Sequence, residues 1–121
     1  MKKKNDPRHL KRAKLLKIIF SWQFRSEKKP AKCAQNIIAN LPKIDRLIEK
    51  SAPDRPIKQI NRVDLSILRL AIYELVVEKE TPLKVVIDEA VELGKEYGSD
   101  SSASFINGAL GKLVEIKHLK T

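Results

Sequence analysis

Cysteine, histidine and glycine are scarce in this 121-residue chain, and each shortage excludes a class of site. The single cysteine, Cys33, excludes a disulfide framework and a cysteine-built zinc site, and is typical of a reducing cytosol. Neither His9 nor His118 has a second histidine or a cysteine at metal-ligand spacing, so no metal site is expected. The four glycines form neither of the common phosphate-binding loops.

Long apolar runs and catalytic groupings are missing as well. Charged residues interrupt each apolar run before it reaches the roughly 18 residues of a membrane span, and the lysine-rich N-terminus lacks the pattern of a secretory signal. We expect Asp88, Glu89 and Glu92 to form a solvated acidic helix face, and Cys33 to be a small core residue. The sequence therefore predicts a cytoplasmic protein with no catalytic residue and no cofactor.

Acidic residues are rare only in the first quarter of the chain. The net charge is +10, and residues 1–32 hold twelve basic but only two acidic side chains, whereas residues 33–121 hold thirteen of each. A neutral body with one strongly basic end favours a polyanionic partner at that end over a merely soluble surface. Only six aromatic residues are present, and Trp22 and Tyr97 are expected in the core, so a broad base-stacking platform is not predicted.

The first helix is expected to start at Asp6 and Pro7, a cap followed by proline at the first helical position, and to run to about Arg25. Two apolar stripes at helical spacing are expected to be buried, one made of Leu10, Ala13, Leu16, Phe20 and Phe24, the other of Leu15, Ile19 and Trp22. The basic half of the helix is expected to project from the domain and to expose Arg8, Lys11 and Arg12.

The remaining apolar segments also have helical rather than strand periodicity, which predicts an all-α fold. A stripe over residues 34–48 keeps its phase across Pro42, which favours one kinked helix, although a new helix opening at Pro42 remains an alternative. Residues 51–56 are expected to form a linker and residues 62–78 a buried central helix. Two more helices are expected, one from the Thr81–Pro82 cap to a stop at Gly98, and one capped by the serines of 99–102.

Three segments of the neutral part carry distinctive motifs. Residues 67–75 read Ile-Leu-Arg-Leu-Ala-Ile-Tyr-Glu-Leu, residues 81–93 pass from a proline to Ile-Asp-Glu-Ala-Val-Glu-Leu, and residues 105–110 read Phe-Ile-Asn-Gly-Ala-Leu. Their order and spacing resemble the NusB transcription antitermination family. The stretch from Arg8 to Trp22, which closes with Phe-Ser-Trp at 20–22, resembles the arginine-rich first helix of that family.

The resemblance implies a compact helical bundle of two small subdomains, residues 1–52 with the basic arm and residues 53–121. It also implies an RNA-binding antitermination factor that binds boxA-type RNA of ribosomal RNA leader transcripts together with the ribosomal protein NusE. Through that complex the chain would meet RNA polymerase and other Nus factors.

When the family's functional positions are carried over to this sequence, the resemblance also assigns roles to individual residues. The RNA-binding set is Lys3, Lys4, Arg8, Lys11 and Arg12, with the tail lysines adding non-specific affinity. Phe20 and Asp64 match positions at which the family meets its protein partner. Arg69 and Glu74 are expected to form an internal polar network that holds the two subdomains together.

The chain also departs from the family pattern. Family members usually carry another helix between the first helix and the one that begins here near Ala31, where this chain has a short loop. Asp88 and Gly94 replace an asparagine and an alanine, and Gly94 should cost up to about 1 kcal/mol of helix propensity unless close packing uses it. Two alternatives therefore remain: a module that binds NusE without RNA, and an accessory domain to a ribosomal RNA methyltransferase.

Overall fold

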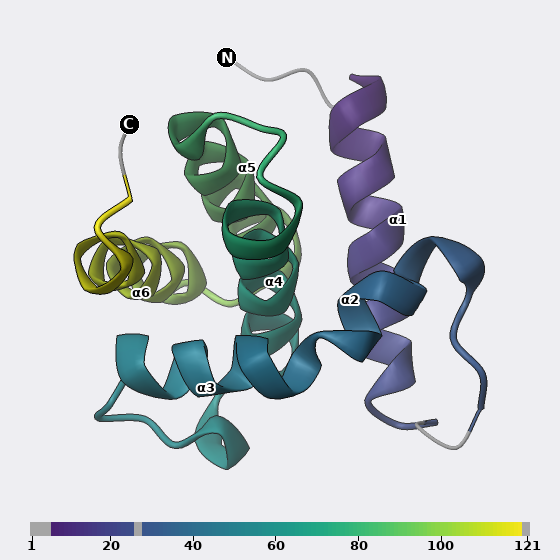
Figure 1. Cartoon of the computed structure of the whole chain (residues 1–121), viewed down its shortest axis with the longest axis horizontal. Helices are drawn as coiled ribbons and strands as arrows, with labels where there is room; N and C mark the ends of the chain where they lie inside the picture. Colours follow the sequence, from purple (N-terminus) through teal and green to yellow (C-terminus); the bar gives the residue numbers. More distant parts are fainter. Residues whose placement is uncertain (1–5, 26–27, 120–121) are drawn as a thin grey trace.

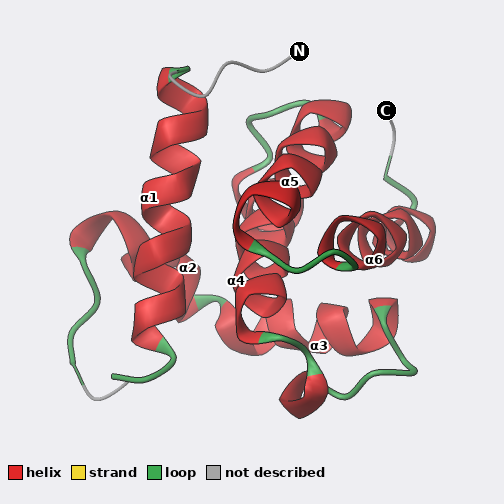
Figure 2. Ribbon diagram, turned by 180° about the vertical axis from the view of Figure 1, so that it is seen from behind, coloured by secondary structure: helices red, strands yellow, loops and turns green. Residues whose placement is uncertain are grey.

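A computed structural model gives the fold and describes residues 6–25 and 28–119. These residues form helices joined by short loops, and no strand is found among them, which confirms the all-α prediction (Figures 1 and 2). The α-helices are α1 (Pro7–Trp22), α2 (Gln35–Ala39), α3 (Leu41–Ser51), α4 (Arg62–Ile72), α5 (Leu83–Tyr97) and α6 (Ser102–Lys117). Three short helical segments complete the order: η1 (Lys32–Ala34), η2 (Ile57–Gln59) and η3 (Tyr73–Glu78).

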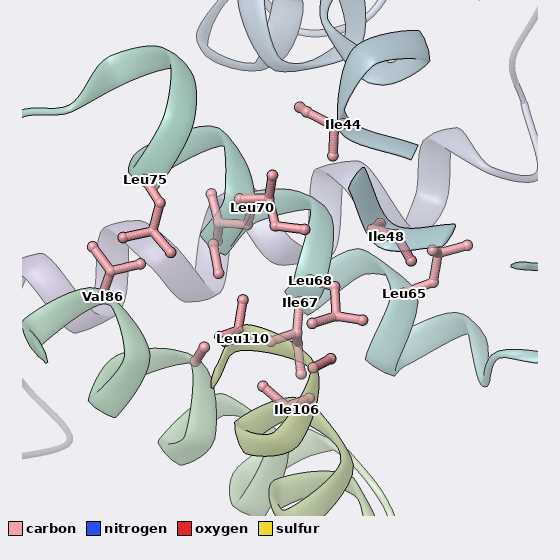
Figure 3. Packing of buried hydrophobic residues seen from close by; sticks show 14 of the residues in the cluster. Ile44, Ile48, Leu65, Ile67, Leu68, Leu70, Leu75, Val86, Ile106 and Leu110 are labelled. Carbon is pink, nitrogen blue, oxygen red and sulfur yellow. The ribbon is translucent and has the colours of Figure 1, made fainter. Parts of the chain in front are cut away.

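Helix α4 lies at the centre, with α1 on one side, α5 and α6 on the other, and α3 across one end (Figure 1). Every residue from Asp64 to Ile72 is buried. The side chains of α4 meet those of α3, α5 and α6 in one hydrophobic cluster, shown in Figure 3 around Ile67 and Leu68. This burial confirms the prediction of a buried central helix. A helix with apolar residues on every side is stable only when neighbours cover all of its sides.

The central helix ends in a wider turn. Residues Tyr73–Glu78 continue α4 as a π-helix, and Lys79 ends it in the left-handed conformation at φ 58°. The amide of Lys79 donates a hydrogen bond of 2.9 Å to the carbonyl of Glu74. Helix and π-turn together span the predicted range of 62–78.

Pro42 does not kink a single helix. Helix α2 ends at Ala39 and α3 begins at Leu41, so Pro42 lies in the first turn of a new helix. The favoured expectation was wrong and its alternative correct. Proline lacks an amide hydrogen, and the first turn is the part of a helix where that hydrogen has no acceptor within the helix.

The predicted start of α1 is confirmed, and its predicted buried stripes are only partly correct. The carboxylate of Asp6 accepts a hydrogen bond of 2.8 Å from the amide of Arg8, and this bond lowers the pKa of Asp6 below its ordinary value. The helix ends at Trp22 rather than Arg25. Leu10 and Phe24, both expected to be buried, are 51% and 61% exposed.

Three further expectations are corrected or sharpened near the helix ends. Helix α5 starts at Leu83 with Pro82 as its cap, one residue later than predicted, and no side chain of Thr81 caps it. Cys33 is exposed, because only Ala34 of the η1 turn faces the core. Gly94 is buried where α5 crosses α6, and an added Cβ would lie 2.9 Å from Ile106 Cδ1, so close packing does use this glycine.

Two segments bear on the function. Among the described residues 23–25 and 28–31, between α1 and η1, no helix is present. Within the described part of the chain, no helix has the length and apolar character that crossing a membrane requires.

Candidate nucleic-acid interface

Four basic side chains form an exposed row on α1. Arg8, Lys11, Lys14 and Lys17 recur every third residue, and all four are exposed. The Arg8 guanidinium makes one exposed pair, at 3.5 Å from the Asp6 carboxylate, and its side chain is 82% exposed. We call these four residues the cationic strip. Exposed cations on an ordered helix can neutralise successive phosphates of a nucleic acid.

Arg12 does not belong to this strip, and the expectation that it is exposed was wrong. It is 9% exposed, and its Nε and Nη2 atoms donate hydrogen bonds of 2.9 and 2.7 Å to the two carboxylate oxygens of Glu74. Its Nη1 atom lies 3.9 Å from Glu89 Oε1. Hydrogen bonding to Glu74 raises the pKa of Arg12 above its ordinary value. The guanidinium therefore holds α1 to the rest of the fold instead of facing a phosphate.

His9 lies beside Arg12 and is also buried. Its Nδ1 atom is 3.0 Å from Glu89 Oε2, and its Nε2 atom is 2.8 Å from Glu96 Oε2. Only the imidazolium can donate from both ring nitrogens to two carboxylates. Glu89 is 6% exposed, which corrects the expectation that it belongs to a solvated acidic face. The true inner face of α1 runs through His9, Arg12, Ala13, Leu16 and Ile19.

The pairing of His9 makes the docking of α1 sensitive to pH. The hydrogen bond to Glu89 raises the pKa of His9 above 6.5. Burial acts in the opposite direction, but its effect on the pKa is smaller. A raised folded-state pKa stabilises the protein below pH about 6.5, and this stabilisation is lost as pH rises through the folded-state pKa.

We expect the free energy of unfolding to fall as pH rises above about 6.5, and this fall to be smaller in His9→Gln. Chemical denaturation across a pH series measures it. His118→Gln, at an exposed position, is the matched control and should keep the wild-type pH dependence. Identical pH dependence in wild type and His9→Gln would show that the imidazolium does not contribute.

The other end of α1 is tied to the start of α4. The side-chain amide of Gln23 donates hydrogen bonds of 3.1 Å to the carbonyl of Arg62 and 2.6 Å to Ser66 Oγ. Helix α1 is thus held at its start by ion pairs and at its end by amide hydrogen bonds. Fixed at both ends, α1 presents the four cations of the strip along a line that winds about half a turn round the helix, because each step of three residues falls short of a full turn.

The predicted internal polar network of Arg69 and Glu74 is present, but the two residues have separate partners. Arg69 donates hydrogen bonds of 3.0 and 2.9 Å to the two carboxylate oxygens of Asp45 on α3. Glu74 pairs with Arg12 on α1. Each pair ties the central helix to one helix of the N-terminal half.

Phe20 and Asp64, the two candidate partner residues, are placed differently. Phe20 is half-buried and packs edge-to-face against exposed Phe24 at a centroid distance of 5.3 Å. Asp64 is 2% exposed in the first turn of α4, beside the Asn61 cap. There its carboxylate complements the positive end of the helix dipole, and it is not on the surface.

Two of the candidate RNA-binding residues, Lys3 and Lys4, lie outside the described residues. Two others that the structure places in the strip, Lys14 and Lys17, were not selected from the sequence. The regular interval of three from Arg8 to Lys17 was the available signal, since each of these residues is a neighbour on the helix of the one three positions further on.

The fold and this surface define a class of protein: a helical bundle, strand-free in its described part, whose first helix presents a row of cations to solvent. Within the described ranges, no cluster of histidine, cysteine, aspartate or glutamate side chains has the makings of a metal site. The sequence profile of the NusB family matches residues 31–115. The chain belongs to the NusB family.

Individual relatives agree. The transcription antitermination protein NusB of Roseiflexus castenholzii is 53% identical over 73 residues, which cover 59% of this chain and 51% of that protein. Its counterpart from Acetivibrio thermocellus is 47% identical over 83 residues, covering 69% and 57%. The chain thus spans about half the length of the curated relatives it matches. The solved structure of T. maritima NusB has a TM-score of 0.79 at 32% identity and covers 91% of this chain and 92% of its own.

Proposed function

We propose that this chain is an RNA-binding factor of transcription antitermination, which binds boxA-type RNA of ribosomal RNA leader transcripts together with NusE. Relatives of similar sequence are named transcription antitermination proteins. The observation that carries the proposal is the cationic strip, because four of the twelve basic residues of segment 1–32 are exposed there on one ordered helix. RNA polymerase and other Nus factors would be reached through the complex, and the role is binding rather than catalysis.

The test is the affinity of the purified chain for a boxA-type RNA and for a scrambled RNA of equal composition, with and without purified NusE. We expect the boxA-type RNA to bind at least tenfold more tightly than the scrambled RNA when NusE is present. Base contacts would supply this difference, since phosphate contacts are blind to sequence. Equal affinity for both RNAs would contradict the boxA assignment.

NusE binding without measurable RNA binding would instead support the alternative of a pure interaction module. One observation favours this alternative: the chain has a loop between α1 and η1, where family members usually carry another helix. The distinction is clear in practice, because RNA binding falls with salt whereas an apolar protein interface depends on salt much less.

The partner surface is proposed to lie around Phe20 and Phe24. Phe24 is 61% exposed and forms the edge-to-face pair with Phe20, so these rings present an apolar patch at the end of α1. We expect Phe24→Ala to weaken NusE binding at least tenfold, as truncation of an aromatic interface residue commonly does.

The matched control is Val85→Ala, which removes another exposed apolar side chain, on α5. Isothermal titration with purified NusE measures both variants. Unchanged affinity in Phe24→Ala would place the NusE surface elsewhere.

A further inference from the structure

An open groove of about 520 Å³ runs along α1, bounded by residues 28–31 and by the end of α5. Its apolar lining includes Leu10, Ala13, Ile18, Trp22, Pro30 and Tyr97. Five exposed cations also line it: Lys14, Lys17, Arg25, Lys28 and Lys29. None of the lining residues that the structure describes is acidic. We call this feature the α1 groove.

The shape of the groove follows a helix face. Its lining positions on α1 recur every three or four residues, from Leu10 through Lys14 and Lys17 to Ser21. Such spacing is typical of a face that packs against another helix. From Leu10 to Trp22 this face is about 18 Å long, or a little over three turns, at 1.5 Å per residue.

The apolar lining is unusually open to water at one end. Leu10 is 51% exposed, although it lies on an ordered helix whose opposite face is buried. Ile18 and Trp22, two and three turns further on, are half-buried. A partner that covers this face would remove apolar surface from water, which stabilises the complex by roughly 25 cal/mol per Å².

Stacked RNA bases fit this groove less well than a helix does. Only two aromatic rings line it, and the Lys17 ammonium already lies 5.7 Å from the centroid of the Tyr97 ring. The other ring, Trp22, packs against the hydrophobic core. Base recognition by stacking needs accessible ring faces, whereas aliphatic side chains flanked by cations suit a helix with apolar and acidic sides.

We propose that the α1 groove binds an acidic amphipathic helix of a partner protein. The apolar side of that helix would cover Leu10, Ile18 and Trp22, and its carboxylates would pair with Lys28, Lys29 and the other cations. Lys14 and Lys17 belong to both the groove and the cationic strip, whereas Arg8 and Lys11 of the strip lie outside the groove.

The test uses a fluorescein-labelled synthetic peptide of 18 residues, composed of leucine and glutamate with the leucines at helical spacing. The control peptide has the same composition, with the leucines distributed so that no apolar face forms. We expect the amphipathic peptide to bind the full chain at least tenfold more tightly than the control. Equal binding of the two peptides, or no binding of either, would overturn the proposal.

The groove itself is tested by Leu10→Gln and by the double variant Leu10→Gln with Ile18→Gln, both of which keep the net charge. We expect at least fivefold weaker peptide binding in Leu10→Gln and a larger loss in the double variant. Leu10 is half-exposed, so the single variant should keep its fold, which circular dichroism checks.

Measuring the RNA affinity of the same variants distinguishes the peptide-binding groove from the RNA-binding function proposed above. Both variants should bind RNA within twofold of wild type, because they remove no cation. A tenfold loss of RNA affinity in Leu10→Gln would identify RNA as the occupant and overturn the peptide proposal. Peptide binding that survives both substitutions would overturn it as well.

Discussion

Replacing Arg12 by methionine is expected to lower the free energy of unfolding by about 3–5 kcal/mol. The substitution keeps most of the side-chain volume but removes the charge that faces Glu74. Both residues are less than a tenth exposed, and they share two hydrogen bonds of 2.7 and 2.9 Å. A buried carboxylate without its cation is poorly solvated, and this is the source of the large loss. Urea denaturation followed by circular dichroism measures it.

Two comparisons isolate the cause. Arg46→Met removes an exposed arginine of α3 and should change stability by no more than about 0.5 kcal/mol. The double variant Arg12→Met with Glu74→Leu removes both charges and should recover much of the loss, because a buried ion pair often stabilises no more than an apolar pair of similar volume. A loss below about 1 kcal/mol in Arg12→Met alone would contradict the anchoring role.

Replacing all four residues of the cationic strip by glutamine is expected to weaken RNA binding about 10²- to 10³-fold near 0.1 M salt. Each cation that neutralises a phosphate of single-stranded RNA contributes about 0.7 to the slope of log K against log salt, and four such contacts therefore account for nearly three orders of magnitude at 0.1 M. Glutamine keeps the helix propensity of lysine and arginine, so α1 should remain folded.

The matched control removes the same charge from exposed positions elsewhere: Lys43, Lys50, Lys58 and Lys117. Both quadruple variants have the same net charge, so a general effect of charge would weaken them equally. We expect the control variant to stay within about tenfold of wild type in a fluorescence anisotropy titration. Equal losses in the two variants would show that the strip is not a localised site.

The helices were predictable because their apolar residues recur with a period that burial imposes. Residues 62–78 are the clearest case. Ten of these seventeen residues are apolar and lie on every side of a helix, so the helix must be covered all round, and the structure buries most of its residues. Pro42 was ambiguous for a physical reason. The apolar stripe of 34–48 keeps its phase whether proline bends one helix or opens the next, and only the backbone distinguishes the two cases.

The inner face of α1 was not predictable in the same way. Periodicity counts apolar residues, and it selected Leu10 and Phe24, whereas the structure buries His9 and Arg12. Buried charges need partners, and the partner of Arg12 is 62 residues away in the sequence, while Glu89 is 80 residues from His9. No local pattern reveals such pairs, so the charge of Arg12 and its position in the family pattern assigned it to the RNA surface.

The most direct test of the central claim, that exposed cations on α1 bind RNA, is the slope of log K against log salt concentration. It is measured with single-stranded boxA-type RNA for wild type, the strip variant and the control variant. We predict a slope shallower by about 2.8 in the strip variant and unchanged in the control. A strip variant that keeps the wild-type slope would contradict the account.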